Sequence, residues 1–129
     1  MGSNGPSWGR RIQVHAAARM LAIETQREAD RLACRAWNIG LDQGVTTIQP
    51  SPTIGQAING GFVFLRVHCT ACKQHAHVDL TQVRRPASTP VWQLEGMLAC
   101  ERCRSTGRRA PRAVIDRLTT TKALSGWTG

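Results

Sequence analysis

Cys69-Thr-Ala-Cys72 and Cys100-Glu-Arg-Cys103 are the stretches that decide the fold, and 27 residues lie between them. In each stretch, two intervening residues let both sulfurs turn to one side of a tight turn, from which they can reach one ion at ~2.3 Å. Two such turns supply four thiolates, the ligand set of a tetrahedral zinc site. The spacing therefore predicts one structural Zn²⁺ held by Cys69, Cys72, Cys100 and Cys103, with no coordination position left for a substrate.

The fifth cysteine, Cys34, lies outside the two pairs. It falls in a segment predicted to be helical, where we interpret it as a small buried side chain rather than a reactive thiol. Iron held by the same four thiolates stays open as an alternative to zinc. Redox use of one pair, as in thioredoxin, is less favoured, because neither pair stands where a strand passes into a helix within a βαβ pattern.

Three histidines lie close to the first cysteine pair in the sequence, namely His68, His75 and His77. They could complete a second metal site or replace one thiolate, because imidazole is a common zinc ligand. We interpret them instead as polar surface groups. Since side chains two residues apart in a strand share a face, His75 and His77 are expected on one face.

Length and composition predict one small domain in a reducing compartment. The chain has 129 residues, of which 5% are aromatic, so we expect a modest apolar core to which a structural metal adds stability. The sequence contains no apolar run of about eighteen residues, so it predicts no transmembrane helix. Polar side chains interrupt residues 12–23, so this segment is not read as a secretory signal. The first 23 residues lack acids and hold three Arg, which superficially resembles a transit peptide or twin-arginine signal. We predict a cytoplasmic protein, where thiolates stay reduced.

The N-terminal part of the chain predicts one long helix. Residues 10–37 contain no Pro or Gly and are rich in Ala, Arg, Leu, Glu and Gln, which favour helix. We expect the helix to end at Asn38-Ile-Gly40, and residues 40–52 to complete a helix-and-linker region over 10–52. Residues 1–9, rich in Gly, Ser and Pro, are expected to be disordered.

Residues 53–118 are predicted to form the zinc-ribbon-like domain. Thr53-Ile-Gly-Gln56 has the form of a capping box and opens a short helix over 53–59. Residues 62–68 predict a strand that leads into the first cysteine pair, and 74–80 predict the return strand of a hairpin.

The second half of this domain contains a further helix and a last strand. Ser88-Thr-Pro90 is predicted to begin the helix, with Thr89 as its cap and Pro90 at its first position. Residues 113–118 predict a strand, or less favourably a helix, and 119–129 a flexible tail. The predicted fold class is α+β: a small zinc-ribbon-like β-hairpin domain with a long N-terminal helix and short covering helices.

The positive charge is concentrated at the C-terminal end of the chain. The net charge is +9, and residues 98–129 hold seven basic and two acidic side chains. Arginine forks match phosphate oxygens, so this region is typical of a surface that meets DNA or RNA. The candidate nucleic-acid-binding residues are Arg84, Arg85, Arg102, Arg104, Arg108, Arg109 and Arg112. The alternative is a basic surface that only keeps a small protein soluble.

Other chemistry finds little support in the sequence. Trp92 could stack on a base, but we favour core packing, because a stacking platform interleaves several exposed aromatics with basic groups. No His-Glu-x-x-His helix, phosphate-binding glycine loop or nucleophile elbow is present, and no carboxylates are paired for acid–base catalysis. We therefore predict that the protein is not an enzyme.

Residues 52–118 resemble a group of short, uncharacterised bacterial zinc-ribbon proteins. Their pattern runs TIxQAxxxG, a strand, CxxC, RRPxxTPxxxLE and a second CxxC. The matching residues are Thr53-Ile-Gly-Gln-Ala57, the two cysteine pairs, and Arg84-Arg-Pro-Ala-Ser-Thr-Pro-Val-Trp-Gln-Leu-Glu95. The resemblance covers roughly half of the chain and leaves out the N-terminal helix. It implies a zinc-binding cytoplasmic protein of bacteria and adds little about activity.

These observations lead to a zinc-ribbon-like binding module that is associated with nucleic acid. The alternative is a zinc-stabilised protein–protein interaction module, in which residues 10–37 dock a partner. The apolar stripe of this helix is weak and rich in Ala, so an exposed apolar stripe in the folded chain would favour the alternative. A third hypothesis is a metal- or redox-responsive switch that uses Cys34 or a labile cysteine pair.

Overall fold

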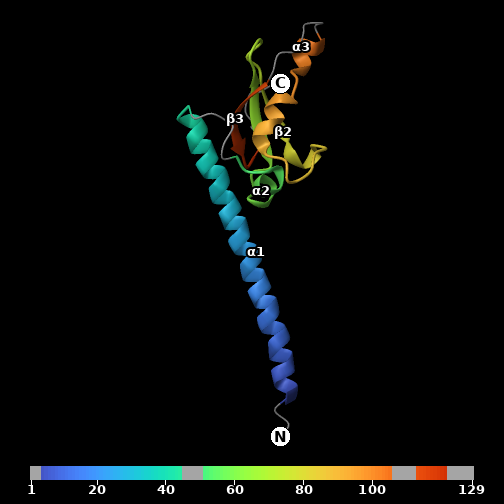
Figure 1. Cartoon of the computed structure of the whole chain (residues 1–129). Helices are drawn as coiled ribbons and strands as arrows, with labels where there is room; N and C mark the ends of the chain where they lie inside the picture. The colour runs from blue at the N-terminus through green and yellow to red at the C-terminus, as the bar shows by residue number, and fades with distance from the viewer. Residues whose placement is uncertain (1–3, 45–50, 106–112, 122–129) are drawn as a thin grey trace.

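The structure is a computed structural model that describes residues 4–44, 51–105 and 113–121. A long helix, α1 (Asn4–Asp42), runs alongside a small domain with its C-terminal part and extends far beyond that domain with its N-terminal part (Figure 1). The domain is built on a three-stranded antiparallel sheet. The predicted α+β fold class is therefore confirmed.

The sheet has the strand order β2-β1-β3. Its central strand is β1 (Phe64–Cys69), and β2 (His75–Asp79) pairs with it as the predicted hairpin, with His68 opposite His75. The last predicted strand is also present. It is β3 (Ala113–Thr119), which pairs with the other side of β1. This pairing places Ala113, the first residue of β3, opposite Cys69 of the first cysteine pair.

The core lies on one face of the sheet. Leu65, Val67 and Cys69 alternate along β1 as its buried side chains, and Ile115 and Leu118 of β3 join them. Complete burial of one leucine side chain stabilises the fold by about 1.5–3 kcal/mol. Further core residues come from α1, from α2 (Ile54–Asn59) and from the segments 80–83 and 91–98. One small apolar cluster therefore holds the helices against the sheet.

The predicted capping box at the start of α2 is present. The Gln56 backbone N–H donates to Thr53 Oγ1 at 3.1 Å, and the Thr53 N–H donates to Gln56 Oε1 at 2.9 Å. Two backbone donors that the helix itself cannot satisfy are thus paired locally. This is why the short α2 begins where the sequence predicts.

The prediction of a helix that begins at Thr89 and Pro90 was wrong in the type of helix and in its first residue. The segment instead forms a 3₁₀ helix, η2 (Val91–Gly96), without a side-chain cap. Pro90 is extended and pairs with Thr53 in an isolated bridge. The Ile54 N–H donates to Thr89 O, and the Val91 N–H donates to Pro52 O, both at 2.9 Å. Because this bridge holds Pro90 extended, the helix can begin only after it. A second 3₁₀ turn, η1 (Leu80–Gln82), follows β2.

Helix α1 is longer than predicted at both ends. It begins at Asn4 rather than near residue 10, and it passes through the predicted stop at residues 38–40 to reach Asp42. Gly44 ends it with a φ of +80°, a conformation that suits glycine. Among the described residues, no helix has both the length and the apolar character needed to cross a membrane.

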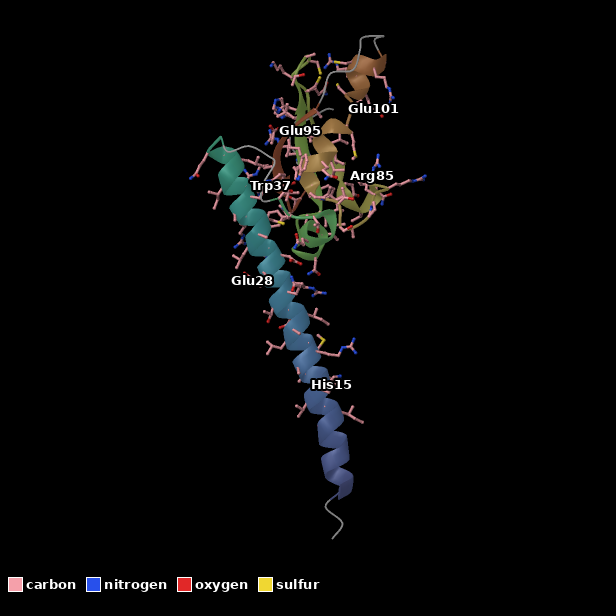
Figure 2. The ribbon with its side chains drawn as sticks, viewed as in Figure 1. His15, Glu28, Trp37, Arg85, Glu95 and Glu101 are labelled. Atoms are coloured by element: carbon pink, nitrogen blue, oxygen red, sulfur yellow. The ribbon has the colours of Figure 1, made fainter. Side chains whose placement is uncertain are left out.

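The continuation of α1 has a tertiary cause. Asn38 lies in the helix, and its side chain contacts the outer edge of β3, where Nδ2 donates to Leu118 O at 2.9 Å and Oδ1 accepts from the Leu118 N–H at 2.8 Å. Trp37, the residue before Asn38 in the helix, is also buried (Figure 2). These contacts stabilise helical geometry where local propensity alone predicts an end.

Candidate metal centre

The four cysteines come from two turns at one end of the sheet. Cys69 is the last residue of β1, and Cys72 lies in the turn that leads to β2. Cys100 directly precedes a short helix, α3 (Glu101–Ser105), which contains Cys103. Sequence reasoning missed α3, because five residues carry too weak a periodic signal.

The first turn is closed by backbone hydrogen bonds. The Lys73 N–H donates to Cys69 O at 3.0 Å, and the Cys69 N–H donates to Gln74 O at 2.9 Å. Lys73 takes a positive φ of 61°, which lets the chain reverse directly after Cys72. The two turns are also joined to each other, since Arg102 Nη1 donates to Gln74 Oε1 at 2.7 Å.

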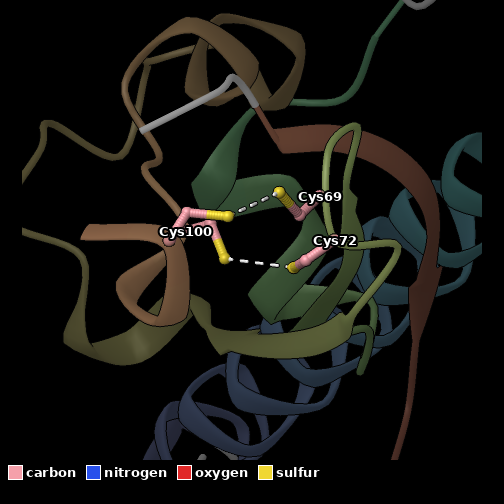
Figure 3. A group of neighbouring side chains, drawn as sticks. Cys69, Cys72 and Cys100 are labelled. Carbon is pink, nitrogen blue, oxygen red and sulfur yellow. Dashed lines mark hydrogen bonds between the residues drawn. The ribbon is translucent and has the colours of Figure 1, made fainter. Parts of the chain in front are cut away.

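The sulfur atoms are arranged as a four-coordinate ion requires (Figure 3). Sγ of Cys69 is 3.7 Å from that of Cys103, and Sγ of Cys72 is 3.6 Å from that of Cys100. All four sulfurs lie within 4.8 Å of one another. Four sulfurs placed tetrahedrally at 2.3 Å from one ion are about 3.8 Å apart. The predicted cysteines therefore form one metal-binding cluster.

The environment of the sulfurs favours a bound cation. The backbone N–H of Cys72, aided by that of Ala71, lowers the pKa of the Cys69 thiol to about 6. Burial raises the pKa of the Cys103 thiol to about 12, and the neighbouring sulfurs add to this effect. Like charges this close together oppose each other's ionisation. The cluster can carry four thiolates only when a cation lies among them.

The ligand count and burial indicate a structural site. Cys69 and Cys103 are buried, while Cys72 and Cys100 are half-buried. Four protein ligands complete a tetrahedron, whereas catalytic zinc sites have three and keep an open position. The ion that fits this cluster would connect the β1–β2 turn to α3 and would not offer a coordination position to a substrate.

The four predicted arginines that the structure describes do not form one patch. Arg102 and Arg104 are exposed on α3, next to the cysteines. Arg84 and Arg85 are exposed in the loop after η1, at the other end of β2, and Arg85 lies well apart from Glu101 of α3 (Figure 2). Arg108, Arg109 and Arg112 lie outside the described residues.

Two interpretations of single residues agree with the structure. Trp92 is partly buried and packs against the core, as expected for a structural tryptophan. Cys34 is fully buried in the core, and this burial raises the pKa of its thiol to about 12. A buried thiol with such a pKa is protonated at neutral pH and poorly reactive.

His75 and His77 share the outer face of the sheet, as predicted, and His75 lies in a group with His68 and a carboxylate that was not predicted. His68 and His75 lie opposite each other in the β1–β2 hairpin and share Asp116 of β3 as a partner. His77 lies opposite Arg66 on the same face, outside the set of three groups that could share one metal ion. Sequence reasoning did not single out Asp116, because its place next to the histidines depends on how β3 pairs with β1.

Comparisons with protein-family models, with curated proteins and with solved structures found no match. The resemblance to bacterial zinc-ribbon proteins therefore stays a prediction, and the function has to be argued from the site itself.

Proposed function

We propose that this protein is a zinc-stabilised binding module. The observation that carries the proposal is the cluster of four sulfurs from two turns, at the separations that a tetrahedral thiolate site needs. Zinc is the ion most typical of four cysteine ligands in a small domain, with iron as the alternative. The bound ion would hold α3 against the β1–β2 hairpin, because the hairpin supplies Cys69 and Cys72, while Cys103 lies in α3 and Cys100 directly precedes it.

Metal analysis of the purified protein tests this part. We expect about one equivalent of zinc per chain from the four-cysteine site, and we expect Cys72→Ser to lose it together with the folded structure, as in other zinc-dependent domains. Cys34→Ala is the matched control, because it also removes one thiol but leaves the four ligands in place. A folded wild type without metal, or Cys72→Ser with normal metal content, contradicts the proposal.

Nucleic acid is the first ligand class that we propose for the module. The net charge of +9 and the excess of arginine after residue 98 support it. Arg102 and Arg104 are exposed on α3 beside the cysteines, and the zinc ion would fix the position of α3. Arginines on a rigid support can make forked contacts to phosphate groups without sequence preference.

Fluorescence anisotropy with mixed-sequence DNA and RNA at several salt concentrations tests this class. Binding through arginine must weaken steeply as salt rises, because each phosphate contact releases counterions. We expect Arg102→Ala with Arg104→Ala to reduce the slope of log K against log salt by about 1–2. Arg84→Ala with Arg85→Ala is the matched control, with a smaller effect because these residues lie at the other end of β2. Absence of binding at low salt contradicts the proposal.

A second candidate function is self-association through α1, and a specific observation favours it. Val14, Leu21, Leu32 and Ile39 are each more than half exposed. They are separated by seven or eleven residues, which are close to whole numbers of helical turns, so they form one line along α1. Such a line is what two helices bury against each other in a coiled coil. A second copy of α1 is the partner that presents a matching line.

Light scattering coupled to gel filtration, over a range of protein concentrations, tests this candidate. We expect a dimer that Leu21→Glu converts to a monomer, because the change puts a charge into the buried line. Ile23→Glu is the matched control. It also replaces an exposed apolar side chain of α1, but two residues away the side chain points to the other side of the helix. A monomer at all concentrations contradicts the candidate.

A further inference from the structure

The second cluster of metal-ligating groups lies on the sheet face opposite the Cys69 side chain. His68 and Cys69 are consecutive in β1, and Cys69 is buried with the core-facing residues. Successive side chains of a strand point to opposite faces, so His68 points away from the core. His75 stands directly opposite His68 on β2. The hairpin thus brings two imidazoles together on its outer face, with ring centroids 5.7 Å apart.

A β-bulge brings a carboxylate to the same place. The pairing of β1 with β3 shifts between Arg66 and Val67, so that Arg66 pairs with Arg117 and Val67 with Ile115. Asp116 is therefore the extra residue of β3. The bulge lets Ile115 and Leu118 both face the core, which a regular strand would not allow because they are three residues apart. Asp116 is left on the outer face beside the histidines.

The three groups converge closely. Asp116 Oδ1 is 2.6 Å from His68 Nδ1, and Asp116 Oδ2 is 3.1 Å from His75 Nδ1. One ligand atom from each residue can be chosen so that all three lie within 4.8 Å of one another. Donors at 2.0–2.2 Å from one ion fit within that span. Three different strands supply the groups, and Asp116 lies 48 and 41 residues after the histidines in the sequence.

We infer that His68, His75 and Asp116 form a second metal site, which takes a divalent transition-metal ion such as Zn²⁺. Two imidazoles and one carboxylate are nitrogen and oxygen ligands that suit zinc or iron(II). Binding requires each neutral ring to carry its proton on Nε2, so that Nδ1 offers its lone pair to the metal. In contrast to the four-cysteine site, three protein ligands leave coordination positions open.

The surroundings give an ion access to this site. The side chains of His68, His75 and Asp116 are 29%, 39% and 24% exposed, so water can reach the metal. His75 and Asp116 also line an open groove of about 590 Å³, to which Asp42 and Glu95 contribute two further carboxylates. Arg66 opposes a cation, since its Nε lies 3.9 Å from Asp116 Oδ2. However, Arg66 Nε makes no hydrogen bond within the described part of the chain. The carboxylate of Asp116 lies closer to the two histidine rings than to Arg66.

The competing explanation is a hydrogen-bond network in which both rings donate Nδ1–H to Asp116. The two explanations differ in one observable, the binding of metal at Nδ1. The test is therefore a Zn²⁺ titration of the full chain, whose four-cysteine site is already saturated, followed by long-range ¹H–¹⁵N NMR of the histidine rings. We expect a second equivalent of Zn²⁺ to shift the Nδ1 resonances of His68 and His75 and to leave His15 and His77 unchanged.

Variants decide whether these three residues act together. Calorimetry measures the affinity of the second site for Zn²⁺ in each variant. Loss of a group that only supports a metal ligand typically lowers metal affinity by ~10–100-fold. We expect Asp116→Asn and His75→Gln each to lower the affinity by more than this. His77→Gln, on the same strand, should leave it unchanged. Amide spectra show whether each variant folds, and His75→Gln serves if Asp116→Asn does not. Unshifted His68 and His75 resonances in excess Zn²⁺, or unchanged binding by folded Asp116→Asn, overturns the proposal, whatever metal the cysteines hold.

Discussion

Lys73 shows how a single residue can limit the stability of the metal centre. Its φ of 61° is a conformation that costs a residue with a side chain about 1–2 kcal/mol, whereas glycine adopts it freely. We expect Lys73→Gly to raise the free energy of unfolding of the metal-loaded protein by up to ~1 kcal/mol, because glycine also gains freedom in the unfolded chain. Denaturant unfolding measures this. Lys73→Ala separates the backbone effect from loss of the ammonium group, and equal stabilisation by Ala and Gly would contradict the explanation.

Cys34 gives a prediction about pH at the same scale. Burial raises the pKa of its thiol from 9.0 to about 12, and the negative charge of Asp30 adds to the effect. Because the thiolate is the reactive form, the native protein should be modified at Cys34 far more slowly than the unfolded chain at neutral pH. Mass spectrometry after timed alkylation of the metal-loaded protein measures this.

The sign of the effect on stability follows from the same shift. Between pH 9 and pH 12 the unfolded chain loses the Cys34 proton while the folded protein keeps it. The contribution to stability is therefore complete below pH 9 and is lost as the pH rises towards 12. Cys34→Ala should abolish this part of the pH dependence, and rapid alkylation of native Cys34 would contradict its burial.

At the scale of elements, the contact between α1 and α2 depends on Gly60. A Cβ atom added there would lie 2.7 Å from the backbone nitrogen of Arg31 and 2.9 Å from the backbone carbon of Asp30. Backbone atoms cannot move away as a flexible side chain can. We expect Gly60→Ala to lower the free energy of unfolding by about 1–3 kcal/mol, the usual cost of overpacking. Gly96→Ala is the matched control, because a Cβ there meets no atom within 4 Å.

Thermal melting of the two variants measures this difference. A Cβ atom at residue 60 that pushes α2 away from α1 should also disturb Asp30. This residue is buried and accepts hydrogen bonds from Asn59 Nδ2 at 2.8 Å and from Gln26 Nε2 at 2.9 Å. Equal melting temperatures for Gly60→Ala and Gly96→Ala would show that α2 does not need its close approach to α1.

Elements whose signals are local could be predicted from the sequence, and elements whose causes are distant could not. The capping box of α2 lies within four residues, and the alternation that marks β1 lies within six. In contrast, α1 continues past Asn38 because of Leu118, which is 80 residues away in the sequence. The extended conformation of Pro90 depends on Thr53 in the same way.

The four-cysteine cluster and the cluster of His68, His75 and Asp116 differ in the same way, because the first has a local signal in the sequence and the second does not. The spacing of the cysteines is itself a chemical signal, so the four-sulfur cluster could be predicted from the sequence alone. The place of Asp116 depends on a bulge between β1 and β3, for which the sequence offers no comparable local sign. Prediction from the sequence therefore identified the four-cysteine cluster, and of the second cluster it identified only the histidines.

At the scale of the whole molecule, α1 consists of two parts with different surroundings. Its side chains from residue 12 to residue 29 are all exposed, whereas Asp30, Cys34, Trp37 and Asn38 are buried against the domain. A helix without tertiary contacts is marginally stable in water. The inner part should therefore share the stability of the domain, and the outer part should open independently of it.

Amide hydrogen exchange of the metal-loaded protein at low concentration measures this division. We expect fast exchange over residues 12–29 and slow exchange over residues 30–42, because opening of the inner part requires unfolding of the domain. A chelator should accelerate exchange in the inner part and leave the outer part unchanged, since the metal stabilises only what is coupled to the sheet. If α1 pairs with a second copy, protection of residues 12–29 should instead increase with protein concentration, and Leu21→Glu should remove that increase. Slow exchange along the whole helix in a dilute monomer would contradict the division.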